Sequence, residues 1–286
     1  MCSTNLSIDI PFSTPVITHQ AAGIILRTVI EFLAFYKKQI PFPYDMFKLM
    51  TGKIRKQISN DSSSDDWLQM QIERQQALAI ETFDNLNVML ESITNQLEKM
   101  ELNQAVILFG ATSLTPKEAF LINIPPITKN HHYINHQESI QRIARTITMS
   151  ILTSQKFYEI ESKLATTNMF VLLKPKVAPS KTDDSFQLTE DFRLPRSCKT
   201  VILNLQNTSN SIKANCCEHL VVYDDLLTDY GNLSVTDEKL VPGEDDDENE
   251  MNDDSTGKGA TSWYNSTVFV RGFKDVLVKG KSIWNC

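Results

Sequence analysis

The sequence predicts an α+β fold, in which helices pack on one face of a mostly antiparallel sheet. Apolar residues spaced three and four apart run from Ala79 to Met100, which is typical of an amphipathic helix. A short apolar run with β-branched members follows from Ala105 to Gly110 and indicates a buried strand. Helices and strands do not alternate along the chain, so a parallel sheet built from βαβ units is disfavoured.

The first half of the chain is expected to be mainly helical. Residues 1–13 are predicted to be a flexible tail, and Thr14 is a candidate N-cap for the first helix. Pro41 and Pro43 end that helix, because proline cannot continue the ladder of backbone hydrogen bonds. The expected helices are 15–38, 44–50, 67–102 and 136–160.

The second half is expected to supply most of the sheet. We expect a single domain over 14–278, a tail over 279–286, and a loop over 176–190. The strand before Pro125 is expected at an edge of the sheet. The expected strands are 105–110, 119–124, 168–173, 200–205, 218–223, 267–270 and 276–278.

An acidic insert dominates the charge of the chain. The whole sequence of 286 residues has a net charge of -7. Residues 224–258 carry thirteen Asp or Glu and two Lys, a net of -11, so the remainder is about +4. Such a segment buries too little apolar surface to order itself, so a disordered insert is predicted at about 224–260. The mildly basic remainder lacks a dense Lys/Arg stripe, which disfavours nucleic-acid binding.

The sequence offers no sign of membrane insertion or secretion. No apolar run reaches the ~20 residues that cross a bilayer. The N-terminus has neither a basic segment nor an apolar one, so it is not predicted to be a secretory signal. Five scattered cysteines without a C-x-x-C pair favour free thiols in a reducing compartment.

Motifs of catalysis and cofactor binding are missing from the sequence. G-x-G-x-x-G, G-x-x-x-x-G-K and G-x-S-x-G do not occur. His132 and His136 have a spacing known from metal sites, but a polar loop is the stronger interpretation. The pair Cys216-Cys217 is better explained as two small apolar fillers than as a redox centre. We therefore expect no enzyme, and no catalytic, metal-binding or cofactor-binding residues.

The helix expected at 136–160 has two different sides. Its inward stripe is formed by isoleucines at 140, 143, 147 and 151. The opposite side carries Gln137, Gln141, Ala144, Arg145, Thr148 and Leu152. That side is either an ordinary solvated face or a partner surface on which small residues permit close approach. Spacing alone favours the solvated face.

Three blocks of sequence, and a weaker fourth, together carry a family resemblance. The blocks cover most of residues 12–223 together with 262–274. They are Lys38-Gln-Ile-Pro-Phe-Pro-Tyr44; Arg74-Gln-Gln-Ala-Leu78 through Val106-Ile-Leu-Phe-Gly110 to Leu114-Thr-Pro-Lys-Glu118; Thr267-Val-Phe-Val-Arg-Gly-Phe-Lys274; and, more weakly, Phe192-Arg-Leu-Pro-Arg-Ser197. Taken in chain order, the four blocks resemble those of the comet adaptor family, the HORMA-like proteins that bind the spindle-checkpoint protein Mad-two.

The resemblance implies a HORMA-like fold with three main helices on one face of the sheet. It also implies a non-enzymatic adaptor that binds the closed conformer of Mad-two, chiefly through its third helix. The adaptor would present that conformer to a pachytene-checkpoint type AAA+ ATPase and so silence the spindle assembly checkpoint. The resemblance implies a nuclear and cytoplasmic protein, associated with the spindle or kinetochore in mitosis.

The resemblance also assigns residues to the two partners. An aromatic anchor of the family falls at Ala144, and a polar contact falls at Tyr36. The implied contacts with the HORMA partner are Tyr36, Gln137, Gln141, Ala144, Arg145 and Thr148. The implied contacts with the ATPase are Arg193, Pro195, Arg196 and Ser197.

A second hypothesis from another class stays open at this point. The chain could be a HORMA-like structural subunit of a chromosome or DNA-repair complex, which captures partner peptides beneath its own C-terminal strands. Protection of Thr267–Val278 from proteolysis would distinguish the two, because a peptide-capturing belt is mobile and a self-capped adaptor resists cleavage.

Overall fold

The structure, a computed structural model, describes residues 5–14, 16–58, 67–128, 131, 137–159, 164–177, 184–190, 192–209 and 262–284. Its elements, in chain order, are β1 (Asn5–Phe12), α1 (His19–Tyr36), α2 (Tyr44–Ile58), α3 (Trp67–Lys99), β2 (Leu102–Gly110), β3 (Pro116–Asn123), α4 (Gln137–Thr153), α5 (Gln155–Glu159), β4 (Asn168–Pro175), β5 (Phe186–Thr189), β6 (Lys199–Asn207), β7 (Trp263–Ser266) and β8 (Val270–Arg271).

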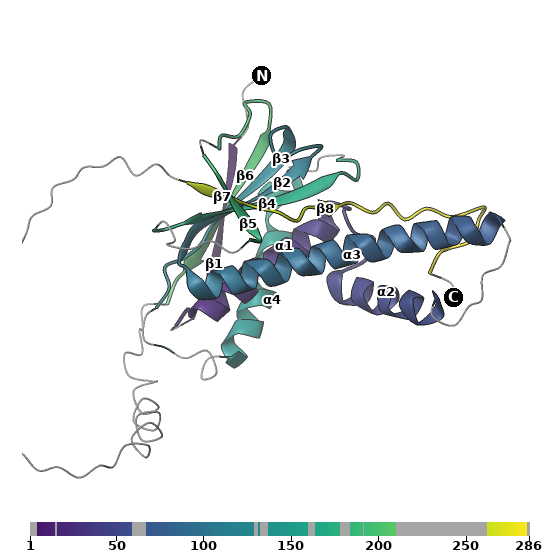
Figure 1. Cartoon of the computed structure of the whole chain (residues 1–286). Coiled ribbons are helices and arrows are strands. Elements are labelled where there is room, and N and C mark those ends of the chain that lie inside the picture. The colour runs from purple at the N-terminus through teal and green to yellow at the C-terminus, as the bar shows by residue number, and fades with distance from the viewer. Residues whose placement is uncertain are drawn as a thin grey trace, which may run out of the picture.

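The described strands form one mixed sheet of eight strands, drawn in Figure 1. Seven follow the order β1-β6-β3-β2-β4-β7-β5, and β8 pairs with β4 beside β7. β6 lies parallel to both of its neighbours, β1 and β3, and the other pairs are antiparallel. The predicted α+β class is confirmed, and the sheet combines both kinds of pairing.

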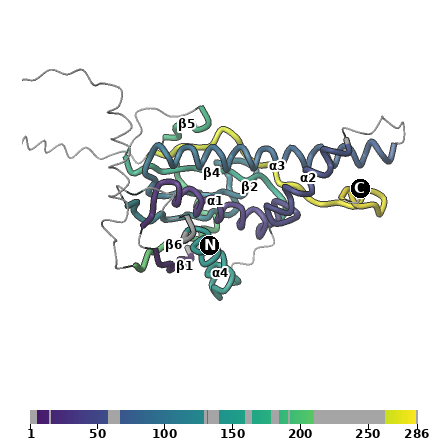
Figure 2. Tube along the Cα trace, turned by 90° about the horizontal axis from the view of Figure 1, so that it is seen from below, coloured from purple at the N-terminus to yellow at the C-terminus, as the bar shows by residue number. Residues whose placement is uncertain are grey.

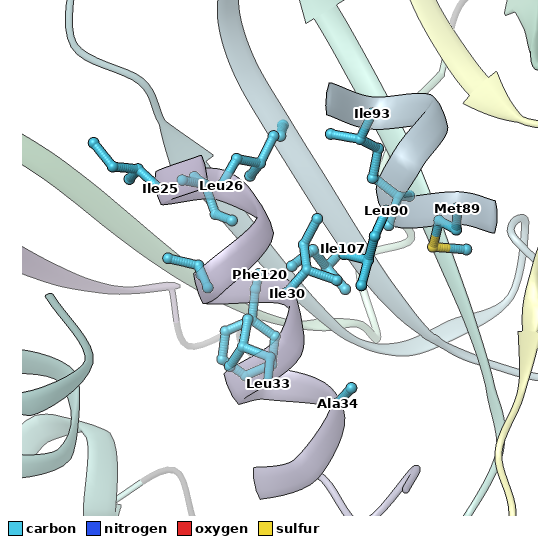
Figure 3. Close-up of a cluster of buried hydrophobic side chains, with 14 of the residues drawn as sticks. Ile25, Leu26, Ile30, Leu33, Ala34, Met89, Leu90, Ile93, Ile107 and Phe120 are labelled. Atoms are coloured by element: carbon cyan, nitrogen blue, oxygen red, sulfur yellow. The ribbon is translucent and has the colours of Figure 1, made fainter. Parts of the chain in front are cut away.

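The main core lies between the sheet and the helices α1, α3 and α4. Figure 3 shows its centre, where Ile30 and Leu33 of α1 and Leu90 of α3 meet Ile107 and Phe120 of the sheet. Because successive side chains of a strand point to opposite faces, the neighbours of Ile107 in β2 belong to a second, smaller apolar cluster on the face without these helices. This explains why β2 is apolar at nearly every position.

Helix α1 begins later than the sequence suggested. The cap is Thr18 rather than Thr14, and its hydroxyl accepts a hydrogen bond from the backbone N–H of Ala21 at 3.2 Å. Thr14 instead donates its backbone N–H to the side chain of Asn207, at the end of β6. The helix ends at Tyr36, with Lys37 as its C-cap, ahead of the two prolines.

The predicted N-terminal tail is wrong, because residues 5–12 form strand β1. Ile8, Ile10 and Phe12 are buried, and the residues between them face outward. This alternation is a period-two signal that the sequence already contained. The side-chain amide of Asn204 in β6 donates to Ser7 at 2.9 Å and to Asp9 at 2.7 Å, which fixes the register of β1.

Several other boundaries also differ from the predictions. The strand before Pro125 is not at an edge, since β3 lies between β2 and β6. The loop expected at 176–190 contains β5, and the closing strands lie at 263–266 and 270–271 rather than at 267–270 and 276–278. Helix 136–160 is interrupted at Ser154. The strand predicted at 218–223 and the acidic insert fall outside the described residues.

Helices α2 and α3 form an arm that extends past the sheet, as Figures 1 and 2 show. α2 is a full helix rather than the short one expected at 44–50. It packs through the buried Phe47 and Ile54 and is joined to α3 by an ion pair between Arg55 and Asp84. The segment after β8 runs along α3 to the end of the arm, and Ile283, which lies within the tail predicted at 279–286, is fully buried.

A polar junction holds the end of α1, the start of β4 and the segment after β8 together. The buried side chain of Gln39 donates to the carbonyl of Lys37 at 2.6 Å and accepts from the backbone N–H of Thr167 at 2.8 Å. The backbone carbonyl of Gln39 accepts a hydrogen bond from the backbone N–H of Phe273 at 2.8 Å. The backbone N–H of Gly272 donates to the backbone carbonyl of Thr167 at 2.9 Å. Two of the sequence blocks that carry the resemblance meet here.

Gly272→Ala should destabilise the fold by about 1–3 kcal/mol, the usual cost of overpacking a filled site. A Cβ atom at Gly272 would overlap the side-chain oxygen of Gln39 and lie 2.5 Å from the carbonyl oxygen of Thr167. Urea unfolding measures the change. Gly52→Ala in α2 is the matched control: a Cβ there meets nothing within 4 Å, so it should not destabilise the chain. Equal effects of the two substitutions would contradict the close approach at Gly272.

Candidate partner-binding surfaces

The outer face of α4 is the first candidate surface. The predicted inward stripe is confirmed, because the isoleucines at 140, 143, 147 and 151 are buried. They pack into the main core, and the helix lies against α1 and β1, as Figure 1 shows. The outward side of α4 therefore remains on the surface of the described structure.

The predicted partner residues of this helix whose side chains the structure describes share that outward side. Gln141 and Arg145 are exposed, and Ala144 and Thr148 are half-buried beside them. Thr148 donates its hydroxyl to the carbonyl of Ala144 at 3.0 Å, so its methyl group is left to make contacts. Gln137 opens the helix, and its side chain lies outside the described residues.

Met149 is a surface residue that the sequence reasoning missed. It is 53% exposed and follows Arg145 by one helical turn, so the two side chains are neighbours on the outer face. Arg142 is also exposed on this side. Met149 is two residues beyond the buried Ile147, or about 200° around the helix, and this angle could have placed it outside. A large exposed apolar side chain that follows two guanidinium groups along one helix face is typical of a binding surface.

Tyr36 lies at the end of α1 and packs within the molecule. Its ring stacks with Phe32 at 5.7 Å between centroids and tilts against Phe157 of α5 at 4.6 Å. Phe157 is buried and reaches Phe120 of the sheet. Tyr36 is half-buried in this aromatic row and supports α5, the short helix that continues α4. Its predicted contact with a partner stays a prediction.

A buried ion pair lies beside this aromatic row. The Lys37 ammonium is 2.8 Å from a carboxylate oxygen of Glu118, and both side chains are only 4% exposed. The ammonium also lies over the ring of Phe120, with 5.2 Å to the centroid. The pair joins the end of α1 to β3. It therefore anchors Tyr36, on which Phe157 of α5 packs, to the sheet.

The loop at 192–198 is the second candidate surface and lies on the other face of the sheet. Phe192 and Leu194 pack against the smaller apolar cluster, and Phe192 contacts Trp263 edge-on at 5.6 Å. Three of the residues assigned to an ATPase contact, Arg193, Arg196 and Ser197, are exposed, and the fourth is half-buried. The apolar side chains of the loop therefore hold it to the sheet while its cations face outward.

A turn closes this loop at Cys198. The backbone N–H of Cys198 donates to the carbonyl of Pro195 at 2.9 Å. The Cys198 side chain is buried, and burial raises the pKa of its thiol to about 11. The thiol is therefore protonated at neutral pH and packs as a small apolar group.

Metal-ligating side chains do not gather in the part of the chain that the structure describes. No group of three His, Cys, Asp or Glu residues there could hold a metal ion. His132 and His136, the spaced pair of the sequence analysis, fall outside the described residues. No described helix is both long enough and apolar enough to cross a membrane.

A comparison with known families identifies the chain. The family described as "p31comet: Mad1 and Cdc20-bound-Mad2 binding" matches residues 1–231, which is most of the sequence. No curated protein matches the chain significantly. The matched range includes β1 to β6, and with them both candidate surfaces. The chain therefore belongs to the p31comet family, whose members bind Mad2 in its complexes with Mad1 and Cdc20.

Proposed function

We propose that this chain is a HORMA-like, non-enzymatic adaptor that binds the closed conformer of Mad2 through the outer face of α4. It then presents that conformer to a pachytene-checkpoint type AAA+ ATPase through the loop at 192–198, and the spindle assembly checkpoint is silenced. Such an adaptor acts in the nucleus and cytoplasm and associates with the spindle or kinetochore in mitosis.

The exposed row of Arg142, Arg145 and Met149 on a rigid helix is the observation that carries this proposal. Methionine fills irregular apolar sockets, and a guanidinium group pairs with a carboxylate at the rim. The family's aromatic anchor is replaced here by the small residue Ala144, so Met149 supplies the large apolar contact instead. Beneath this face, the isoleucine stripe holds the helix in a fixed position.

The position of the loop at 192–198 supports the proposed contact with the ATPase. α4 belongs to the helix-covered side of the sheet, and the loop at 192–198 packs on the opposite side. A protein with its two binding surfaces on opposite faces can hold both partners at once. Arg193 and Arg196 give the loop a positive charge, which suits an acidic surface on the ATPase.

The closed C-terminal segment favours an adaptor over a peptide-capturing subunit. Val270 and Phe273 are buried, and Thr82 donates its hydroxyl to the carbonyl of Arg271 at 3.0 Å. The backbone N–H of Thr267 donates to Ser185 at 2.9 Å. A segment that is paired this way within its own chain is already capped, whereas a belt that captures peptides must open.

Calorimetry with Mad2 locked in the closed or the open form tests the proposed function. An adaptor must prefer the closed form, because a ligand that binds both conformers equally shifts neither population. We expect closed Mad2 to bind at least tenfold more tightly than open Mad2. Equal binding, or none, would refute the proposal and favour the peptide-capturing subunit.

A further inference from the structure

The segment from Phe273 to Trp284 forms a strap over the arm, outside the range that the family matches. Most of the strap is exposed, including Val276 at 46% and Leu277 at 62%. It turns back at Lys279-Gly280, where Val278 and Lys281 exchange two backbone hydrogen bonds of 2.9 and 3.0 Å. The strap is thus held at both ends, by the buried Phe273 and the buried Ile283, and the ammonium of Lys279 lies over the ring of Trp67 at the turn.

The end of the strap fills a pocket on the arm, between α2 and α3. Ile283 is fully buried, and its carbonyl accepts a hydrogen bond from the buried amide of Gln76 at 3.1 Å. The indole of Trp284 contacts three phenylalanine rings, each in an edge-on arrangement. The rings are Phe42 at 5.2 Å, Phe47 at 6.1 Å and Phe273 at 6.1 Å between centroids.

Two features of the strap oppose this docking. Lys279 has a positive φ of 49°, a conformation that residues other than glycine adopt at a cost. The indole N–H of Trp284 is buried and has no hydrogen-bond acceptor among the described residues. The aromatic and apolar contacts of the strap favour docking, whereas the strained turn and the unsatisfied indole N–H oppose it. The net free energy of docking is therefore small enough for the strap to leave the site.

We propose that this pocket is a peptide-binding site, whose occupant in this chain is its own Ile283–Trp284. The site takes a short turn with a β-branched residue followed by an indole: Gln76 binds the backbone carbonyl, and the aromatic cage binds the ring. The same segment from a second copy of the chain can occupy the site when the strap is released. The pocket lies on the arm, away from α4, so this site is separate from the proposed Mad2 surface.

Competition between the attached and the free segment gives the test. A tethered segment has an effective concentration of about a millimolar, so it excludes a free peptide of similar affinity at micromolar concentration. We would titrate a fluorescent peptide of residues 274–286 into the full chain and into the W284A variant, and measure anisotropy. The peptide should bind W284A at least tenfold more tightly than the unmodified chain. A peptide carrying the same alanine should bind neither.

Two further variants control for misfolding of W284A. Gly280 has a φ of 80°, so Gly280→Val strains the turn without touching the pocket, and should also increase peptide binding. Leu277→Ala changes an exposed residue of the strap and should match the unmodified chain. Equal peptide binding by all variants, or binding that ignores the tryptophan of the peptide, would overturn the proposal. If W284A still binds closed Mad2, the loss of the docked strap does not affect the proposed Mad2 surface, and the two proposals can be tested separately.

Discussion

Met149→Glu is expected to weaken the binding of closed Mad2 by at least about thirtyfold, or roughly 2 kcal/mol. The substitution replaces the largest exposed apolar side chain of α4 with a carboxylate on the outer face. The new carboxylate must lose its hydration when the surfaces meet, and it also draws the guanidinium group of Arg145, one helical turn away, from the partner. Calorimetry against closed Mad2 measures the loss. Met149 is half-exposed, so the stability of the free chain should change by less than about 0.5 kcal/mol.

Met70→Glu is the matched control for this result. Met70 is 59% exposed on α3, on the arm rather than on α4, so its replacement carries the same chemistry to a different surface. The proposed interface predicts normal binding for this variant. Equal losses of affinity for the two variants would show that the effect comes from charge alone. Unchanged binding of closed Mad2 by Met149→Glu would show that the Mad2 site does not include Met149.

Lys37→Met is expected to destabilise the fold by about 3–5 kcal/mol, the usual cost of leaving one charge of a buried pair unpaired. The Glu118 carboxylate would remain 4% exposed without its ammonium partner. A domain of this kind has a total stability of about 5–15 kcal/mol, so the variant should unfold at a much lower urea concentration.

A double variant separates the charge from the packing at this site. Lys37→Met with Glu118→Leu removes both charges and keeps apolar volume between α1 and β3, so it should recover most of the lost stability. Lys176→Met is the exposed control: the Lys176–Glu101 pair is 3.3 Å apart, but Lys176 is 63% exposed, and such pairs contribute less than about 1 kcal/mol. Additive losses in the double variant would contradict a coupled pair.

The tertiary contacts give a physical reason for the blocks that carry the family resemblance. The first block contains Gln39, which binds Lys37 and Thr167, and the last block contains Gly272, which leaves room for that amide. Glu118 in the middle block pairs with Lys37, just before the first block. The three stronger blocks thus meet at one buried junction, whereas the weaker fourth block packs on the other face of the sheet.

The candidate α4 surface could be predicted only in part. The isoleucine stripe fixed the inward side of the helix, because a period of 3.6 residues is a local property. Gln141 and Arg145 were correctly expected outside. Met149 was missed because methionine is usually a core residue, and the packing of the Tyr36 ring on Phe157 depends on a contact between distant segments that no local pattern shows.

By itself, the sequence determined the helices and strands whose apolar periods are strong, above all α3, β2 and the inner side of α4. It also determined the class of the fold and, through the ordered blocks, the family. Only the tertiary structure decided that the strand at 5–12 lies at an edge of the described sheet beside β6, because β6 lies almost two hundred residues away and no local pattern encodes a parallel pairing. It likewise decided that Trp284 enters the arm and that the two candidate surfaces lie on opposite faces, since these are outcomes of packing between distant segments.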